Sequence, residues 1–299
     1  MNNPMLTIRT LSVSRELIDR VHQEGQTFIN ESAPVNAYAV LRNELDPKHT
    51  AFVYHIGGNI WRKIRANNQL NMHGLQPRDA KQNAFANSLV DPEVLISIAI
   101  GEAGTGKTTL ALAYALDQYV SRRAPIILSK PASMVGEGKA FGPVPGDVDE
   151  KYAPYLASYE IALRRILGKS HGKGYFKMMM QKGDVQYVPI ELVRGSEFAD
   201  CTFILDEAQN LSWHELKSLI SRMGSNTKMI ILGDLEQIDT GATKRQTGLY
   251  QLLNSAPFKS SRVGAAIELD TQYRSAITAL VADVDKWIKR GGTNSDLPF

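Results

Sequence analysis

The sequence predicts a doubly wound α/β fold built on a mainly parallel sheet, and three observations lead to this prediction. The apolar run VLISIAI, at 94–100, ends directly in the glycine-rich stretch GEAGTGKTT. Further apolar runs end in polar residues at 125–130, 201–207 and 229–234. Segments typical of helices, such as TTLALAYALDQYV and SWHELKSLISRM, separate them. Strands that alternate with helices in this way form a parallel sheet whose carboxyl ends share one ligand-binding edge.

Residues 1–70 differ from the rest of the chain. The stretch SRELIDRVHQEG places its apolar residues at helical spacing and ends in a stop-like Gly25. Two β-prone runs at 51–64 are joined by Gly57-Gly58, which predicts a β-hairpin. We therefore expect a small N-terminal accessory segment, to which the sequence assigns no chemistry, followed by a nucleotide-binding domain over 71–299.

The glycine-rich stretch fits the P-loop pattern G-x-x-x-x-G-K-[ST] at every fixed position. Backbone N–H groups of such a loop cradle phosphate oxygens at a helix N-terminus. We expect Lys107 to reach the β- and γ-phosphates and the Thr108 hydroxyl to bind Mg²⁺. A chance glycine turn is the alternative, but the order strand, loop and helix favours the P-loop. The predicted cofactor-binding residues are Gly101, Glu102, Ala103, Gly104, Thr105, Gly106, Lys107, Thr108 and Thr109.

Other candidate residues follow the later strands. Asp206 is expected to hold Mg²⁺, and Glu207 to activate the attacking water as general base. Gln237, in GDLEQ, can bond the γ-phosphate or that water, and Arg274 can act as an arginine finger. Each also has a plain alternative, as a solvent-facing acid, a loop residue or a surface arginine. No N-K-x-D element of guanine-specific GTPases occurs in the sequence, so ATP is the expected nucleotide.

Composition narrows the class of protein. The chain is 43% hydrophobic and 22% charged, with a net charge of +3, which is ordinary for a soluble protein. Its longest apolar run is far shorter than the roughly 20 residues of a membrane helix. A single cysteine, Cys201, excludes an intrachain disulfide and suits a reducing compartment. We expect a cytoplasmic protein without membrane contact.

The stretch 163–182 is strongly basic and has no acidic residue. It combines cations with two aromatic residues, so phosphate contacts and base stacking could occur together. A solvated basic helix and loop is an equally open interpretation. The candidate nucleic-acid contacts in this stretch are Arg164, Arg165, Lys169, Lys173, Tyr175, Phe176 and Lys177.

The order LDEAQN and then GDLEQ is that of superfamily 1 helicases, and it closely resembles the PhoH-like ATPases from Leu75 to Lys286. The resemblance implies a RecA-like core in which Gln82, within GLQPRDAKQNAF, reads the adenine. SKPA and ELVRGS are similar to two further family elements, which adds Lys130 and Arg194 to the candidate nucleic-acid contacts. The sequence departs from the family pattern at Ser196, which stands in place of a second arginine, and in a longer loop at 136–142.

Family members are ATPases with one RecA-like core, and some form rings or carry an N-terminal PIN ribonuclease domain. Residues 1–70 show no PIN-like set of acids, so we expect no nuclease activity. The resemblance implies a homo-oligomer, a hexameric ring, that acts on single-stranded nucleic acid, with RNA favoured and DNA possible. The expected function is a Mg²⁺-dependent ATPase of the RNA helicase or remodelling type. A nucleotide-gated assembly module and a small-molecule kinase are the alternatives.

Overall fold

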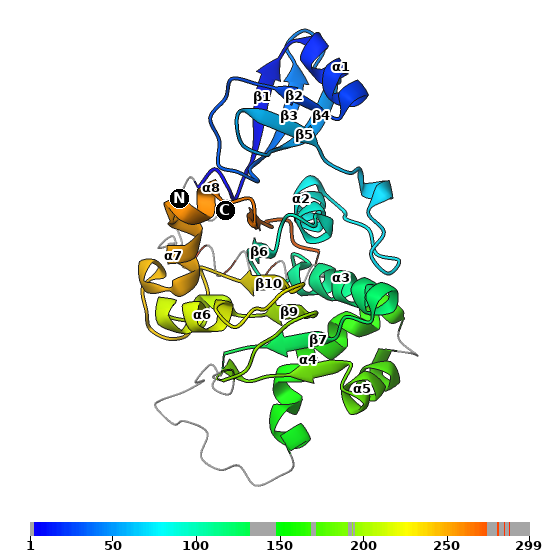
Figure 1. The fold of residues 1–299 in the computed structure, drawn as a ribbon, viewed down its shortest axis with the longest axis vertical. Helices are drawn as coiled ribbons and strands as arrows, with labels where there is room; N and C mark the ends of the chain where they lie inside the picture. The colour runs from blue at the N-terminus through cyan, green and yellow to red at the C-terminus, as the bar shows by residue number, and fades with distance from the viewer. Residues whose placement is uncertain are drawn as a thin grey trace, which may run out of the picture.

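The computed structural model describes residues 3–131, 148–168, 172–190, 193, 195–273, 280, 284 and 287, with backbone alone at 148–155 and 172–173. Within them the chain forms two sheets, one of five strands and one of six. The smaller sheet lies above the larger one in Figure 1, and helix α2 (Ala80–Val90) lies between them in that view.

The smaller sheet has the strand order β1-β3-β4-β5-β2. Its strands are β1 (Ile8–Val13), β2 (Gln26–Phe28), β3 (Tyr38–Asn43), β4 (Thr50–His55) and β5 (Ile60–Lys63). The pair β1 and β3 is parallel, and the other neighbours are antiparallel. Helix α1 (Arg15–Glu24) packs Ile18 and Val21 against Trp61 and ends at Gly25 in the left-handed conformation. The predicted helix and the β4–β5 hairpin are confirmed, whereas the sequence did not indicate the other three strands.

The larger sheet confirms the predicted parallel architecture. Its strand order is β11-β6-β10-β9-β7-β8, and every neighbouring pair is parallel. Its strands are β6 (Ile96–Ile100), β7 (Ile126–Ser129), β8 (Val185–Tyr187), β9 (Thr202–Leu205), β10 (Lys228–Gly233) and β11 (Gly264–Glu268). The register places Gly233 beside Ile100 and Ile231 beside Leu205, so three strand ends meet at one edge.

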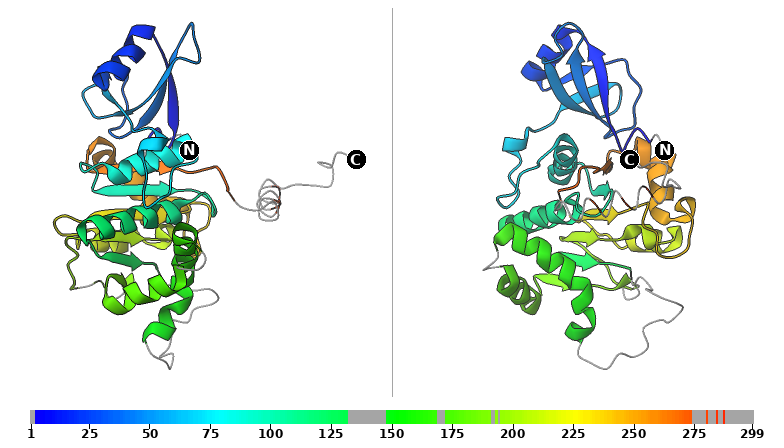
Figure 2. Two further views of the ribbon diagram at one scale, coloured as in Figure 1. Left: turned by 90° about the vertical axis from the view of Figure 1, so that its right-hand side faces the viewer. Right: turned by 180° about the vertical axis from the view of Figure 1, so that it is seen from behind.

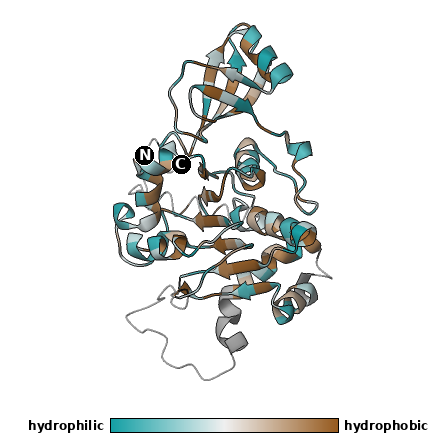
Figure 3. Cartoon of the chain, in the orientation of Figure 1, coloured by the Kyte–Doolittle hydropathy of each residue, from teal (hydrophilic) through white to brown (hydrophobic). Residues whose placement is uncertain are grey.

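Helices cover both faces of this sheet, as Figure 2 shows in two further views. One face carries α2, α3 (Lys107–Arg122), α4 (Val148–Leu167) and α5 (Gly172–Lys182), and the other carries α6 (Trp213–Ile220), α7 (Gly248–Asn254) and α8 (Ala256–Ser260). Strand β10 shows why its sequence is continuously apolar. Ile230 and Leu232 belong to one core and Met229 and Ile231 to the other, so both sides of the strand are buried. The hydropathy colouring in Figure 3 shows the strands of the larger sheet as largely hydrophobic.

The two sheets are tied together by hydrogen bonds and packing. The Asn36 side chain donates to the Gly264 carbonyl at 2.9 Å, and the Arg262 Nε donates to the Ile56 carbonyl at 2.9 Å. Met5 and Leu6, which precede the first strand of the smaller sheet, pack into the core between the larger sheet and helices α6 to α8. The start of the smaller sheet is therefore anchored on the larger one. Along the described part of the chain, no helix is both long and apolar enough to cross a bilayer.

Candidate nucleotide-binding site

The P-loop runs from the end of β6 to the start of α3. Gly101, Gly104 and Gly106 all have positive φ angles, of 136°, 92° and 96°. A side chain at Gly101 would collide with the Leu269 carbonyl, and one at Gly106 would lie 2.8 Å from the Gln82 Nε2. The glycines are thus required by backbone conformation and by close approach of neighbours. Sequence and structure agree on the loop, which opens α3 at Lys107.

Lys107 folds back over the loop. Its Nζ donates to the Gly101 carbonyl and, at 3.0 Å, to the Glu102 carbonyl. Beneath the loop, the buried Gln82 side chain donates from Nε2 to the Thr105 carbonyl at 2.9 Å. Its Oε1 accepts the Arg78 N–H at 2.9 Å. Gln82 therefore lies against the phosphate loop and supports it, a role that the sequence did not indicate.

A segment after β11 crosses the outer side of the loop. The Gln272 side chain donates to Glu102, and the Tyr273 N–H donates to the Gly104 carbonyl at 3.1 Å. The Tyr273 hydroxyl donates to Asp79, the N-cap residue of α2, at 2.5 Å. This places the chain at the loop immediately before Arg274, which itself lies outside the described residues.

Asp206 follows the fully buried β9 and lies opposite the start of α3. The Thr108 hydroxyl donates to its Oδ2 at 3.5 Å, and the Glu207 N–H donates to its Oδ1 at 3.0 Å. Burial raises the pKa of Asp206 to about 6, and the adjacent Glu207 carboxylate adds to the rise, while Lys130 and Lys107 oppose it. Asp206 as a whole residue is 8% exposed. Its ionised carboxylate is therefore poorly solvated, and a bound cation would stabilise it.

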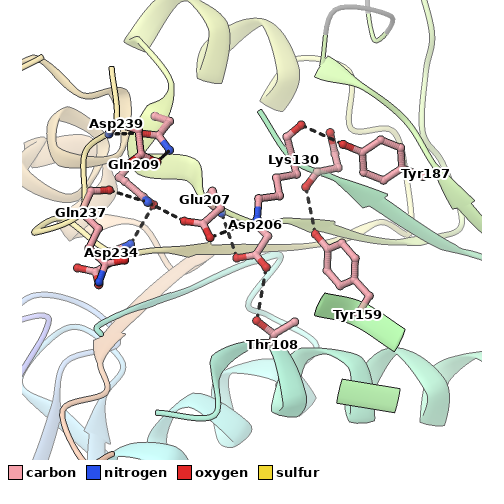
Figure 4. A network of polar contacts seen from close by, with 12 residues as sticks. Thr108, Lys130, Tyr159, Tyr187, Asp206, Glu207, Gln209, Asp234, Gln237 and Asp239 are labelled. Atoms are coloured by element: carbon pink, nitrogen blue, oxygen red, sulfur yellow. Dashed lines mark hydrogen bonds and ion pairs between the residues drawn. The ribbon is translucent and has the colours of Figure 1, made fainter. Parts of the chain in front are cut away.

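Glu207 lies at the centre of a polar network (Figure 4). Its Oε1 lies 3.3 Å from the Lys130 Nζ, and its Oε2 accepts the Gln209 Nε2 at 2.7 Å. Its φ of 56° is left-handed, which costs a non-glycine residue about 1–2 kcal/mol. Two partners hold this carboxylate, and a strained backbone presents it at the sheet edge.

Gln209 connects this carboxylate to the neighbouring strand, and sequence reasoning missed it. Its side chain is fully buried, and Nε2 also donates to the Gln237 carbonyl at 2.9 Å. Its Oε1 accepts the Asp234 N–H at 2.9 Å. One amide thus bridges Glu207 and the loop after β10. The glutamine is visible in the stretch DEAQN. Its bridging role could not be inferred from the sequence, because that role depends on β9 and β10 being neighbours.

The remaining predicted residues are placed differently. Gln237 is exposed at the edge of the network, where its backbone carbonyl rather than its side chain accepts the hydrogen bond from Gln209. Lys130 was expected to contact nucleic acid, but its ammonium pairs with Glu207 inside the nucleotide site. The side chains of Ala103 and Thr109 are partly exposed beside the loop.

The donor set at Asp206 suits Mg²⁺. A carboxylate and a hydroxyl supply hard oxygen ligands, which this ion prefers. Over the part of the chain that the structure describes, no group of three or more His, Cys, Asp or Glu side chains could hold a metal. Mg²⁺ typically binds through one or two protein oxygens and the phosphates of its nucleotide. Thr108 and Asp206 fit that arrangement.

The basic stretch forms the end of α4 and all of α5. Arg165 and Lys177 are exposed, whereas the Arg164 guanidinium lies 2.5 Å from Glu160 in an ion pair. Phe176 was expected to stack on a base, but its ring is 5% exposed and packs in the core, so this expectation is wrong. Tyr175 packs partly against the same core. Lys169, the Lys173 side chain and Arg194 lie outside the described residues.

A model of the protein family described as PhoH-like protein matches residues 74–284. This chain belongs to that family. The family resemblance expected from LDEAQN and GDLEQ is thereby confirmed. Family membership and the P-loop geometry together support nucleotide hydrolysis of the ATPase type as the class of activity.

Several proteins are similar to this chain over part of their length. Protein PhoH2 of Bacillus subtilis is 26% identical over 284 residues, which are 92% of this chain and 63% of that protein. The PhoH-like protein of the same organism is 40% identical over 141 residues, 47% of this chain and 42% of that one. This chain therefore spans less than two thirds of either relative. A solved structure of Pif1 helicase from Candida albicans aligns at a TM-score of 0.32 and 12% identity, covering 66% of this chain and 41% of that one. That likeness is too weak to bear on the activity.

Proposed function

We propose that this chain is a Mg²⁺-dependent ATPase whose turnover is coupled to single-stranded nucleic acid, with RNA favoured and DNA as the alternative. The observation that carries the proposal is the meeting of Lys107, Thr108, Asp206 and Glu207 at one edge of the parallel sheet. A cation, two metal ligands and a held carboxylate are the parts that phosphoryl transfer to water requires.

Nucleotide binding would use groups that are now paired within the protein. The β- and γ-phosphates replace the loop carbonyls as acceptors for the Lys107 ammonium, and the loop N–H groups at 101–109 cradle them. Thr108 and Asp206 would hold Mg²⁺, which when bound neutralises phosphate charge. Gln82 is the proposed adenine contact. Its amide has a second N–H besides the one that it donates to Thr105.

Hydrolysis would begin at Glu207, which accepts a proton from water as the water oxygen attacks the γ-phosphorus. Lys130 and Gln209 orient this carboxylate from two sides. Gln237 is the proposed contact to the γ-phosphate or the water, on a loop whose backbone Gln209 holds. Arg274, directly after the loop-bound Tyr273, is the proposed source of charge for the transition state.

The assembly and location of the protein are part of the same proposal. A single ATPase core needs a neighbour to complete its nucleotide site and its grip on a strand, so we propose a hexameric ring of identical chains. Residues 1–70 are proposed as an accessory unit of the ATPase domain at 71–299. The single cysteine supports a cytoplasmic location.

The rival function is a nucleotide-gated assembly module, in which ATP controls ring formation without strand movement. The two differ in whether nucleic acid accelerates hydrolysis. Phosphate release should be measured for the wild type with and without single-stranded RNA and DNA. We expect stimulation by at least one strand. A hydrolysis rate indifferent to both strands would favour the assembly module and contradict the coupling.

A further inference from the structure

A cleft of about 290 Å³ lies between the smaller sheet and the connection that joins α2 to β6. Its sheet side is lined by Tyr38, Tyr54 and Arg62, and its other side by Asn87 and Asp91. A volume of this size is near the lower end of small-ligand pockets, which span roughly 300–1,000 Å³. The cleft shares no residue with the nucleotide edge. Its sheet side precedes the residues that the family model matches, and its other side lies within them.

The sheet side of the cleft presents aromatic rings. Strand register places Tyr38 opposite Tyr54 and Tyr54 opposite Arg62, so the three side chains form a row on one face. The ring centroids of Tyr38 and Tyr54 are 6.3 Å apart. Helix α1 packs on Trp61 and Val53, which alternate with this row, so it covers the opposite face. Tyr38 is 3% exposed and belongs to the core, so the partly exposed Tyr54 is the ring that is open to a base. Aromatic side chains on a sheet face commonly stack single-stranded bases.

The charge balance of the cleft favours an anion. Among the described residues, Arg62, Lys63 and Arg65 have no carboxylate within ion-pair distance, and Lys63 and Arg65 are exposed. The acids of the cleft are already engaged. Asp91 accepts the Tyr54 hydroxyl at 3.2 Å and the Glu93 N–H at 2.9 Å, and Glu93 lies 3.6 Å from Arg262. Asp91 keeps its negative charge, so among the described lining residues three cations stand against one acid without a cationic partner, and the cleft has an excess of positive charge.

Tyr38 is the buried member of the tyrosine pair. It is 3% exposed, lines the cleft, and its hydroxyl makes no hydrogen bond to any described residue. Burial raises the pKa of Tyr38, so the hydroxyl remains a neutral donor. The Tyr38 hydroxyl oxygen is not fully buried, so water can reach it from the cleft.

The far wall of the cleft is held in place from within the core. The buried Lys228 at the start of β10 donates from Nζ to the carbonyls of Ser88 at 2.6 Å and Asp91 at 3.4 Å, and to that of Val94. These carbonyls belong to the end of α2 and the turn before β6. The wall is therefore preorganised, which lowers the cost of ordering it around a ligand.

We propose that this cleft binds one nucleotide of a single strand of nucleic acid, with the base against Tyr54 and the phosphates along Lys63 and Arg65. This inference rests on the proposed function, because it assumes that the protein binds single-stranded nucleic acid. It commits to a strand rather than a free nucleotide because the cations lie exposed at the rim. Phosphates bound there stay in solvent and can continue in both directions.

Binding of a labelled ten-nucleotide RNA and its DNA equivalent, measured by fluorescence anisotropy without ATP, tests the proposal. The variant Lys63→Glu/Arg65→Glu should bind at least about tenfold more weakly, and its salt slope should fall by about 1.4 for two lost phosphate contacts. The matched control Arg20→Glu/Lys48→Glu carries the same charge change on exposed cations that do not line the cleft. It should retain wild-type affinity and slope.

The aromatic part of the proposal has its own readout. Tyr54→Leu should weaken binding on the order of tenfold through lost stacking, while Tyr54→Phe should retain it. Thermal unfolding of each variant confirms that it folds, and Lys63→Gln/Arg65→Gln serves if charge reversal disturbs the sheet. Wild type that binds no strand would contradict the proposed function as a whole.

Two other outcomes concern the cleft alone. Wild type that binds a strand, with both cleft variants binding equally well, would overturn this inference and leave the proposed function standing. AMP is the probe for a free nucleotide. If AMP binds as tightly as the strand and is lost in Lys63→Glu/Arg65→Glu, the site takes a free nucleotide and the strand proposal is wrong. Failure of millimolar AMP to displace the strand supports it.

Discussion

The cations at the nucleotide edge have partners within the protein, whereas those of the cleft beside the smaller sheet have no carboxylate partner in the described part of the chain. At the edge, Lys107 donates to two loop carbonyls and Lys130 lies 3.3 Å from Glu207. In the cleft, Arg62, Lys63 and Arg65 have no carboxylate partner among the described residues. A ligand at the edge must replace acceptors that the protein already supplies. A ligand at the cleft meets an excess of positive charge whose cations are not in ion pairs with carboxylates of the described chain.

Breaking the held carboxylate at the edge should have the largest effect. Glu207→Gln removes the proton acceptor but keeps the size of the side chain, so phosphate release should fall by about 100-fold or more. ATP binding, measured by equilibrium titration, should remain because the loop and Lys107 are untouched. Normal turnover in this variant would show that the general base is elsewhere.

The next effect concerns the residue that holds Glu207 without touching the nucleotide. Gln209→Met removes the amide that bridges Glu207, Asp234 and Gln237, so we expect kcat to fall about tenfold to 100-fold. KM for ATP should change less than kcat, because the phosphate loop is intact. Asn210→Leu is the matched control, since the Asn210 side chain bonds Asp239 and not the Glu207 carboxylate, and its backbone N–H bond to the Glu207 carbonyl is kept in the variant. Equal losses in both variants would point to a merely structural role.

Asp206 makes a prediction about stability. Its folded pKa of about 6 lies above the ordinary value of 3.8, so the folded state is favoured at low pH and loses that advantage as pH rises through 6. Without Mg²⁺ and nucleotide, Asp206→Asn should raise the free energy of unfolding at pH 7.5 by up to about 3 kcal/mol. Urea unfolding in EDTA checks this. The gain should shrink at pH 5, and a gain that is equal at both pH values would contradict it.

The basic stretch sharpens the contrast between paired and unpaired cations, with the smallest expected effect. Lys177 is exposed on α5 without an acidic partner among the described residues, whereas Arg164 pairs with Glu160. Lys177→Glu should weaken strand binding about twofold to fivefold and lower the salt slope by about 0.7. Arg164→Glu should change the slope less. If neither variant alters binding, the stretch is a solvated surface.

Chemistry that lies close together in the sequence could be predicted. The P-loop is contiguous, and its glycines are dictated by local backbone geometry, so the pattern alone located Lys107 and Thr108. Asp206 could be placed because parallel strands end at a common edge. The role of Gln209 could not be found this way, because it depends on β10 lying next to β9.

Two other differences have physical causes in packing. Phe176 recurs with Met179 and Met180 at helical spacing, which indicates a buried face, but its position in a basic stretch suggested stacking. The cleft between the sheets was invisible because Tyr54, Arg65 and Asp91 meet only in the folded chain. Strands β1 to β3 were missed for a similar reason. Val13, Ala39 and Leu41 are buried because they pack with α1, and the sequence around them has no strong strand pattern.

The central claim is that the edge formed by Lys107, Thr108, Asp206 and Glu207 hydrolyses ATP. Phosphate release by the wild type and by Lys107→Ala, each with Mg²⁺ and with EDTA, tests it most directly. We predict release by the wild type with Mg²⁺ alone, and a rate at least about 100-fold lower in Lys107→Ala. Equal release by both proteins, or release unaffected by EDTA, would contradict the account.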